Sequence, residues 1–326
     1  MNVIEVENLS KRFNSINAVD GISFTVRKGE IFGFLGPNGA GKTTTINMLC
    51  TLIKPTSGLA RICGYDIVSQ ENEVRRCIGL VFQDTTLDDR LTARENLELH
   101  ARLYGVPREE RKKRINEVLE MVELKDRENS IVKTFSGGMQ RRLEIARGLI
   151  HYPKVLFLDE PTIGLDPQTR RHVWDYILKL KKEYGMTIFL TTHYMEEADE
   201  MCDRVAIIDH GKIIAMDKPK NLKDSLQGDT IILDVEDKDI EKAMRIFKNA
   251  KKFNGQILLS VKNAGKQIEE IMEKCKRNKI NVLEVNIRKP TLNDVFLKLT
   301  GREIRESDPD LKEQLRKMRI GRGGFR

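Results

Sequence analysis

A glycine-rich run near the N-terminus has the composition of a phosphate-binding loop. Residues 36–43 read Gly-Pro-Asn-Gly-Ala-Gly-Lys-Thr, which fits GxxxxGK[ST], and they follow an apolar strand expected at Ile31–Leu35. Glycines let backbone N–H groups approach phosphates closely, and the N-terminus of the next helix adds about half a positive charge. We expect Lys42 to reach the β- and γ-phosphates of a nucleotide and the Thr43 hydroxyl to ligate Mg²⁺.

Two acids follow a second apolar strand, Val155–Leu158. An Asp-Glu pair at a strand end is ordinarily a turn or a helix cap, but such a strand end lies beside the phosphate loop in parallel sheets. Asp159 is suited to the Mg²⁺ shell, and Glu160 is placed to polarise a water molecule against the γ-phosphate.

A third motif, Ser136-Gly137-Gly138, precedes the helical run Met139–Ile150. A hydroxyl, two backbone amides without side chains and a helix N-terminus together form an anion site. Taken alone, this tripeptide is also a common helix cap. The chain therefore holds two candidate phosphate-binding loops.

Length and composition indicate a folded protein of more than one domain. The chain has 326 residues, of which 33% are charged and 6% aromatic. We find no apolar stretch near the ~18 residues that cross a bilayer, and the chain begins on a strand pattern without a signal-peptide core. We expect a cytoplasmic chain whose membrane role requires a partner.

The cysteines and the net charge indicate the redox state of the thiols and the kinds of partner the chain could bind. The five cysteines are odd in number and never form a CxxC pair, which indicates reduced thiols without a disulfide framework or zinc site. The net charge is +8, and part of it lies in the last residues. A basic end can bind nucleic acid or an anionic membrane surface, but a solvated, flexible tail over 302–326 is the favoured interpretation.

Strand-like and helix-like runs alternate from residue 1 to about 218, which predicts an α/β domain with an antiparallel β portion near its start and a helical insert at about 85–135. Strands are expected at Val3–Val6, Ile22–Val26, Ile31–Leu35, Ile78–Phe82, Val155–Leu158, Thr187–Leu190 and Val205–Asp209. Helices are expected at Lys42–Leu52, Ala93–Tyr104, Arg108–Val122, Gly138–Ile150 and Thr169–Lys182.

The remaining residues predict a second, smaller domain. A compact alternation of strands and helices over 219–301 indicates a small α+β domain. Its last helix is expected at Leu292–Leu299, with Gly301 as a C-cap.

From Asn2 to about residue 218 the chain resembles ATP-binding cassette (ABC) ATPase subunits, because the three motifs occur in the order of that family. The resemblance implies a P-loop NTPase fold with a RecA-like core, an antiparallel β subdomain and a helical subdomain. It implies hydrolysis of ATP with Mg²⁺. In that family the Ser-Gly-Gly signature contacts ATP held by the other subunit, so two copies would bind two ATP molecules head to tail. Asp166 would be the acidic turn that couples the two sites.

The same resemblance implies roles for three further residues. Gln83 would contact Mg²⁺ and the attacking water, His193 would contact the γ-phosphate, and Phe13 would stack on adenine, where the family usually has tyrosine. The Mg²⁺ ligands would be Thr43, Gln83 and Asp159. The loop residues that line ATP would be Gly36, Asn38, Gly39, Ala40, Gly41, Lys42, Thr43 and Thr44.

The signature loop departs from the family pattern at one position. The family commonly has Leu-Ser-Gly-Gly-Gln, whereas residues 135–139 of this chain read Phe-Ser-Gly-Gly-Met. The serine and glycines that face phosphate are intact, so we expect the ATP contact to survive. The role of the missing glutamine is left open, with Gln140 one place later.

The C-terminal part is similar to daunorubicin-resistance-type exporter ATPases, on the ending Pro290-Thr-Leu-Asn-Asp-Val-Phe-Leu-Lys-Leu-Thr-Gly301. This implies an ABC-2-type exporter of a drug, lipid or other amphiphile, with a separate membrane permease and the chain on the cytoplasmic face of the membrane. An importer or sodium-efflux ATPase is an alternative. A soluble ABC protein acting on DNA or ribosomes and a binding-only regulator are less favoured, so we expect no nucleic acid partner.

Overall fold

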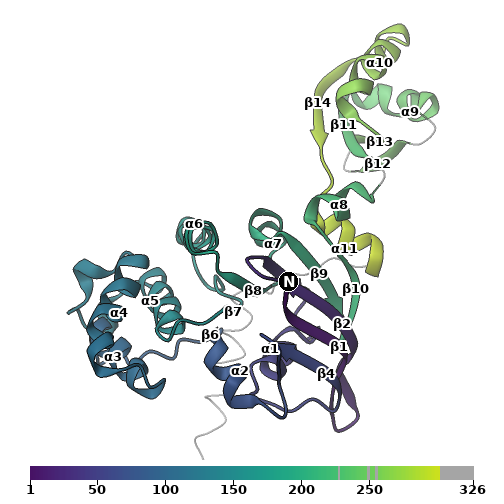
Figure 1. Cartoon of the computed structure of the whole chain (residues 1–326). Coiled ribbons are helices and arrows are strands. Elements are labelled where there is room, and N and C mark those ends of the chain that lie inside the picture. Colours follow the sequence, from purple (N-terminus) through teal and green to yellow (C-terminus); the bar gives the residue numbers. More distant parts are fainter. Residues whose placement is uncertain (227, 248–249, 254–255, 302–326) are drawn as a thin grey trace, which may run out of the picture. The chain divides into compact units, whose positions relative to one another are not determined.

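Six strands of the N-terminal 218 residues form one sheet in the computed structural model, which describes residues 1–226, 228–247, 250–253 and 256–301. They are β3 (Ile31–Leu35), β6 (Ile78–Val81), β7 (Val155–Asp159), β8 (Thr187–Thr192), β9 (Arg204–Asp209) and β10 (Lys212–Asp217). Their order is β10-β9-β3-β8-β7-β6 (Figure 1), with β10 antiparallel to β9 and the others parallel. Every residue of β3, β7 and β8 is buried, as expected for parallel strands covered on both faces.

The order of these strands brings together motifs that are far apart in the sequence. β3 leads into Gly36, β8 ends just before His193, β7 ends at Asp159, and β6 ends shortly before Gln83. These four strands are neighbours in the order β3-β8-β7-β6. Because parallel strands end at the same edge of a sheet, the four chain segments emerge side by side.

A second, antiparallel sheet has the order β2-β1-β4-β5. Its strands are β1 (Asn2–Phe13), β2 (Ile16–Arg27), β4 (Ser57–Ile62) and β5 (Tyr65–Asp66). The strands predicted from the sequence lie inside the longer β1 and β2. The prediction missed β4, β5 and α2 (Glu71–Cys77). β4 was missed because it buries only Ala60 and Ile62 and so lacks a continuous apolar run.

A cluster of phenylalanine rings joins the two sheets. Phe189 of β8 is fully buried and lies with its ring centroid 5.3–5.9 Å from four other rings. Those rings belong to Phe24, Phe32, Phe34 and Phe157. Because Phe24 comes from β2 and the others from the six-stranded sheet, the cluster fixes the antiparallel sheet against the parallel one.

Two helices next to the predicted motifs end where local backbone geometry requires. α1 (Lys42–Leu49) stops short of the predicted Leu52, because Thr51 has a φ of 61°. α6 (Pro167–Tyr184) is longer than predicted. Asp166 caps its N-terminus, and Gly185, at φ 61°, ends it. A short helix, α7 (Met195–Met201), follows His193 and was not predicted.

Three helices pack together, and the first two of them lie in the predicted insert (Figure 1). They are α3 (Ala93–Leu103), α4 (Arg108–Met121) and α5 (Gly137–Leu149), with short 3-10 turns at Lys125–Arg127 and Val132–Thr134. Ile115, Val118 and Leu119 of α4 are buried, as their helical spacing predicts. The group continues past residue 135, because α5 packs against both other helices.

A separate compact unit begins at Pro219. Its elements are α8 (Pro219–Asp224), β11 (Asp229–Val235), α9 (Asp237–Ile246), β12 (Ala250–Phe253), β13 (Gln256–Val261), α10 (Ala264–Arg277), β14 (Val282–Arg288) and α11 (Leu292–Thr300). The antiparallel order β12-β13-β11-β14 is that of a split βαβ domain. Gly301 ends α11 at φ 72°. The predicted charged tail, 302–326, lies outside the described residues.

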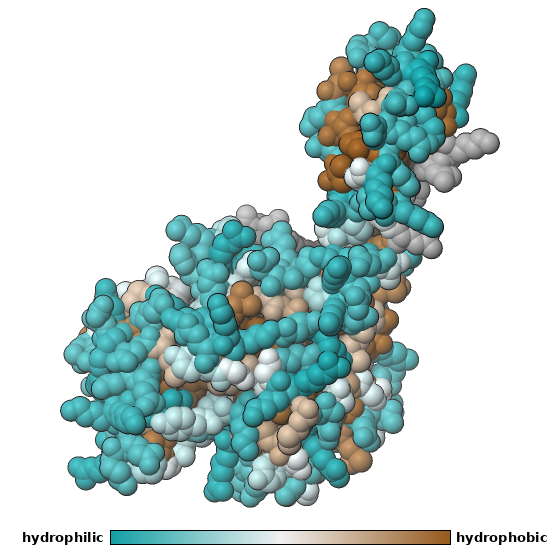
Figure 2. Space-filling model, turned by 45° about the horizontal axis from the view of Figure 1, so that its top comes forward, coloured by the Kyte–Doolittle hydropathy of each residue, from teal (hydrophilic) through white to brown (hydrophobic). Residues whose placement is uncertain are grey.

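The face shown in Figure 2 is largely hydrophilic, and the second unit carries a hydrophobic area on it. The large apolar side chains exposed on the described part of that unit are Met272, Leu283, Ile287, Leu297 and Leu299. Within the described ranges, no helix combines the length and the apolar character needed to cross a membrane.

The ring cluster gives a stability prediction. Phe189→Ala should lower the free energy of unfolding of the first unit by about 3–5 kcal/mol, because it removes a fully buried ring and leaves a cavity. Trp174, the only tryptophan, is buried in α6, so its fluorescence during guanidinium unfolding reports this unit. Leu103→Ala, at a 71% exposed position, is the control and should change stability by about 0.5 kcal/mol or less. Equal losses of unfolding free energy in both variants would contradict the role of the Phe189 cluster in stabilising the first unit.

Candidate nucleotide site

The glycine loop lies between β3 and α1, and its glycines are required by close backbone neighbours. Gly41 caps α1 with a φ of 106°, and a Cβ there would lie 2.4 Å from the Ala18 carbonyl oxygen of β2. A Cβ at Gly36 would lie 2.3 Å from the Ile208 carbonyl oxygen of β9. Neither position tolerates a side chain, so the bare backbone amides of the loop remain accessible to an anion. Asn38 and Gly39 form its exposed part.

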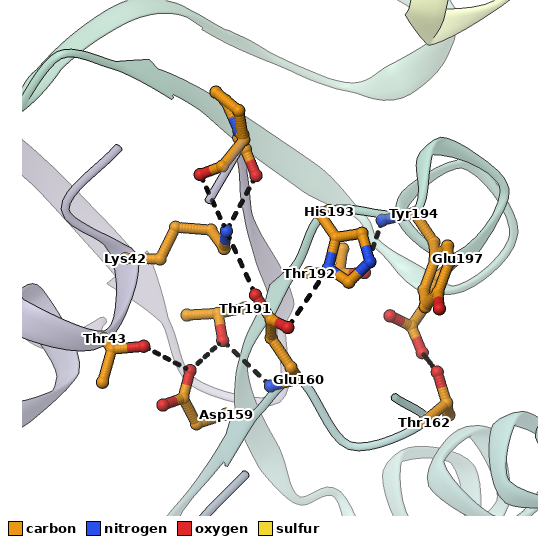
Figure 3. A network of polar contacts seen from close by, with 12 residues as sticks. Lys42, Thr43, Asp159, Glu160, Thr162, Thr191, Thr192, His193, Tyr194 and Glu197 are labelled. Carbon is orange, nitrogen blue, oxygen red and sulfur yellow. Dashed lines mark hydrogen bonds and ion pairs between the residues drawn. The ribbon is translucent and has the colours of Figure 1, made fainter. Parts of the chain in front are cut away.

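Lys42 is buried at the base of this loop. Its Nζ donates to the carbonyl oxygens of Gly36, at 2.8 Å, and Pro37, at 3.1 Å. The same Nζ lies 3.1 Å from Glu160 Oε1, so the ammonium is shared between the loop and the acid at the end of β7 (Figure 3). A buried ammonium at the base of a glycine loop, held there by oxygen acceptors, is suited to binding phosphate.

Asp159 lies between Thr43 and β8. Its Oδ1 accepts hydrogen bonds from Thr191 Oγ1, at 2.5 Å, and from Thr43 Oγ1, at 3.4 Å. Burial raises the pKa of this carboxyl group, and the two hydroxyl donors oppose the rise. A hydroxyl and a carboxylate this close supply the hard oxygen ligands that Mg²⁺ prefers, so these residues fit the ion.

Glu160 occupies a strained position beside two basic side chains. Its φ is 46°, a left-handed conformation that is rare outside glycine and is typical of functional sites. Its Oε2 lies 3.1 Å from His193 Nδ1, and its Oε1 contacts Lys42 (Figure 3). Burial alone would raise the pKa of Glu160, but the hydrogen bond from His193 and the charge of Lys42 outweigh it and lower the pKa. The carboxylate is therefore ionised at neutral pH.

Sequence reasoning missed two buried polar residues, Thr191 within this network and Glu197 near it. Thr191 Oγ1 donates to Asp159 and also accepts the Glu160 backbone amide at 3.0 Å. Glu197 of α7 is fully buried and accepts hydrogen bonds from Thr162 Oγ1, at 2.7 Å, and Trp174 Nε1, at 2.9 Å. The threonines that end the otherwise apolar β8 were an available signal. Nothing in the sequence distinguished Glu197 from its neighbours.

The remaining candidate residues lie outside this network. In the described part of the chain, no hydrogen bond or ion pair joins Phe13, Gln83, Ser136 or Asp166 to it. Gln83 is exposed on the loop after β6. Phe13 ends β1 and is 46% exposed, with Lys11 Nζ 5.1 Å from its ring centroid. An exposed aromatic face of this kind is available for stacking.

The serine loop and the acidic turn meet at the N-termini of two helices. Ser136 caps α5, since its Oγ accepts the Met139 backbone amide at 3.3 Å. Asp166 caps α6 by accepting the backbone amides of Gln168, at 3.1 Å, and Thr169, at 3.0 Å. Hydrogen bonds from Thr169, and more weakly from Gln168, lower the pKa of Asp166.

The two loops are in contact, and the methionine of the signature lies beside them. A Cβ at Gly138 would lie 2.5 Å from Thr169 Cγ2, so this glycine allows the serine loop to approach α6 closely. Met139, which replaces the usual glutamine, lines a cavity of about 550 Å³ together with Ser136, Gly138 and Thr169.

Comparison with known proteins identifies the family. The family model for ABC transporters matches residues 19–163, and that for the C-terminal domain of DrrA1-3-like ATP-binding proteins matches 218–300. The chain is 39% identical to the linearmycin resistance ATP-binding protein LnrL of Bacillus subtilis (strain 168), over 93% of this chain and 100% of that protein. It is 38% identical to the daunorubicin/doxorubicin resistance ATP-binding protein DrrA of Streptomyces peucetius, over 91% of this chain and 92% of that protein.

A solved structure agrees with these matches. The dimeric post-hydrolysis state of the ATP-binding cassette MJ0796, bound to ADP and Pi, has a TM-score of 0.59 at 32% identity and covers 66% of this chain and 98% of its own. The predicted fold class, an ABC-type P-loop domain with a RecA-like core, is thereby confirmed. Because relatives align over more than nine tenths of its length, this chain belongs to the ATP-binding subunits of ABC transporters, in the daunorubicin-resistance group, and is an ATPase.

Proposed function

We propose that this ATPase powers an ABC-2-type exporter whose membrane permease is a separate polypeptide, and that the cargo is a drug, lipid or other amphiphile. The proposal is supported by relatives named for resistance to linearmycin and daunorubicin, and by the DrrA-like match over 218–300. The observation that carries the ATPase part is the buried contact of Lys42, Glu160 and His193 at the edge of the sheet beside the glycine loop.

Each of these side chains has a distinct part in hydrolysis. Glu160 is ionised, so it polarises a water molecule toward the γ-phosphate and accepts its proton. Lys42 contacts the β- and γ-phosphates, and His193 orients Glu160 and the γ-phosphate. Thr43, Asp159 and Gln83 would hold Mg²⁺, which neutralises phosphate charge when bound.

The complete site needs a second copy of the chain. Ser136, Gly137 and Gly138 would contact ATP held by the partner copy in a head-to-tail homodimer, with Asp166 at the junction of the two sites and Phe13 stacked on adenine. The dimeric state of MJ0796 supports this arrangement. Residues 1–218 act as the motor at the cytoplasmic face of the membrane, and 219–301 form an independent domain.

Replacing the proposed base should separate binding from hydrolysis. Glu160→Gln should lower the rate of phosphate release roughly 10²–10⁴-fold, because an amide cannot accept the proton of the attacking water. ATP binding should persist, and an ATP-bound dimer should accumulate on size-exclusion chromatography. Glu196→Gln, at an exposed position on α7, is the matched control and should hydrolyse ATP at the normal rate. Hydrolysis at the normal rate by Glu160→Gln would show that another group is the base.

Mixed dimers should test whether the serine loop acts on the partner's nucleotide. Lys42→Ala disables the phosphate loop, and Ser136→Asp places a negative charge against phosphate while it preserves an N-cap residue on α5. Each variant alone should be inactive. An equal mixture should recover about a quarter of the normal ATPase rate, because half of the dimers are mixed and each has one complete site. A mixture that dimerises and stays inactive would refute the arrangement in trans.

A further inference from the structure

Helix α5 carries a buried ion pair that the nucleotide site does not use. Arg141 Nη1 and Glu144 Oε2 are 2.8 Å apart, and their side chains are 7% and 2% exposed. The pair lies about one turn and two turns after the Ser136 cap, on the helix whose N-terminus forms the serine loop. Buried ion pairs contribute little net stability, so the contacts of this pair are more informative than its presence.

Arg141 holds three backbone carbonyl groups around the acids and the glutamine of the site. Its Nε donates to the Pro161 oxygen at 2.6 Å, and its Nη2 donates to the Asp159 oxygen at 3.2 Å. These two carbonyls flank Glu160 in the sequence. Its Nη1 donates to the Phe82 oxygen at 2.5 Å, immediately before Gln83. One guanidinium group therefore joins the Glu160 turn to the Gln83 loop.

Glu144 holds the other end of the Gln83 loop. Its Oε1 accepts the backbone amide of Thr86 at 2.8 Å, while Arg147 Nη1 donates to the Thr86 oxygen at 3.2 Å. Residues 82–86 are thus attached to α5 at both ends. Gln83 lies directly after one of these two attachment points, so a displacement of the attached ends of the loop would also displace α5.

We propose that the Arg141–Glu144 pair couples the two nucleotide sites of the dimer. It transmits displacements of a subunit's own Glu160 turn and Gln83 loop to the serine loop that this subunit presents to its partner's ATP. The inference rests on the proposed homodimer with the serine loop in trans. Arg141 and Glu144 are positioning residues, since they contact only backbone and each other around the site.

The chemistry of the pair agrees with this role. Arginine presents several N–H donors in a rigid plane, which suits simultaneous bonds to carbonyls on different segments. Apolar side chains of similar volume would fill the same space without directing any carbonyl or amide. Replacing both members by such side chains therefore removes the linkage while it avoids an unpaired buried charge.

The test uses the mixed dimers of the Lys42→Ala and Ser136→Asp chains. The double change Arg141→Met with Glu144→Leu is added to one of the two chains at a time. The complete site takes its Gln83 and Glu160 from the Ser136→Asp chain and its serine loop from the Lys42→Ala chain. The decisive placement is in the Lys42→Ala chain, which supplies only the serine loop. There the change should lower kcat about fivefold, within the range of coupling energies between sites. The KM for ATP should stay within about twofold, because the phosphate loop and Phe13 belong to the other chain.

A second ion pair in the same helical group, with a buried arginine and a partly exposed glutamate, is the control. Arg114 and Glu117 of α4 are also an i,i+3 pair, with Arg114 6% exposed at its side chain. Arg114 donates to the carbonyls of Leu149 and Ile150, at the opposite end of α5 from the serine loop. Arg114→Met with Glu117→Leu should leave mixed-dimer turnover unchanged. Unfolding followed by Trp174 fluorescence should show that both double variants remain folded.

The outcomes separate the inference from the function on which it rests. Loss of turnover with the Arg141→Met, Glu144→Leu change in the Lys42→Ala chain supports coupling, whether or not the other placement also lowers turnover. Loss of turnover only with the change in the Ser136→Asp chain means that the pair positions the catalytic loops of its own subunit and nothing more. No loss of turnover in either placement means that the pair positions neither loop. Both results overturn the coupling. If mixed dimers with the pair intact recover no activity, the arrangement in trans fails, and the coupling fails with it.

Discussion

The site depends on keeping one buried carboxylate charged. Glu160 is removed from water, which opposes its presence as an anion, and its backbone is held in an unfavourable conformation that the surrounding structure must stabilise. Lys42 and His193 supply the compensating contacts, each about 3 Å away. These two residues follow different strands, so the charge is maintained only while β3, β7 and β8 stay in register. The phenylalanine cluster around Phe189 stabilises the same strands from within the core.

Much of this arrangement could be predicted from the sequence. The buried parallel strands are short apolar runs with a sharp polar boundary, and the β3 prediction agrees with the structure at both ends. Asp159 and Glu160 were found because they directly follow an apolar strand, and Lys42 because it completes the glycine-rich motif. His193 was found only through the resemblance to the ABC family. The ABC fold and the ATPase activity were implied by the resemblance to that family, which rests on the order of the motifs along the chain.

The residues that hold the site residues in place through hydrogen bonds could not be predicted from the sequence. Arg141 acts through backbone carbonyl groups of distant segments, and such contacts leave no periodic or compositional trace. β4 was missed because its apolar residues are too few for a strand pattern. Helix ends shifted where a cap decided them, as at Asp166 and Gly185, since capping outweighs propensity at the last turn.

The close approach at Gly41 links recognition of the base to recognition of the phosphates. The carbonyl of Ala18 that excludes a side chain at Gly41 belongs to β2, and β2 pairs with the end of β1 through Phe13 and Ile16. The hairpin that carries Phe13, the residue proposed to stack on adenine, is thus in direct contact with the glycine loop proposed to bind the phosphates. Under these proposed roles, selectivity among nucleobases and affinity for the phosphate chain are not independent properties, because a change in the hairpin reaches both contacts.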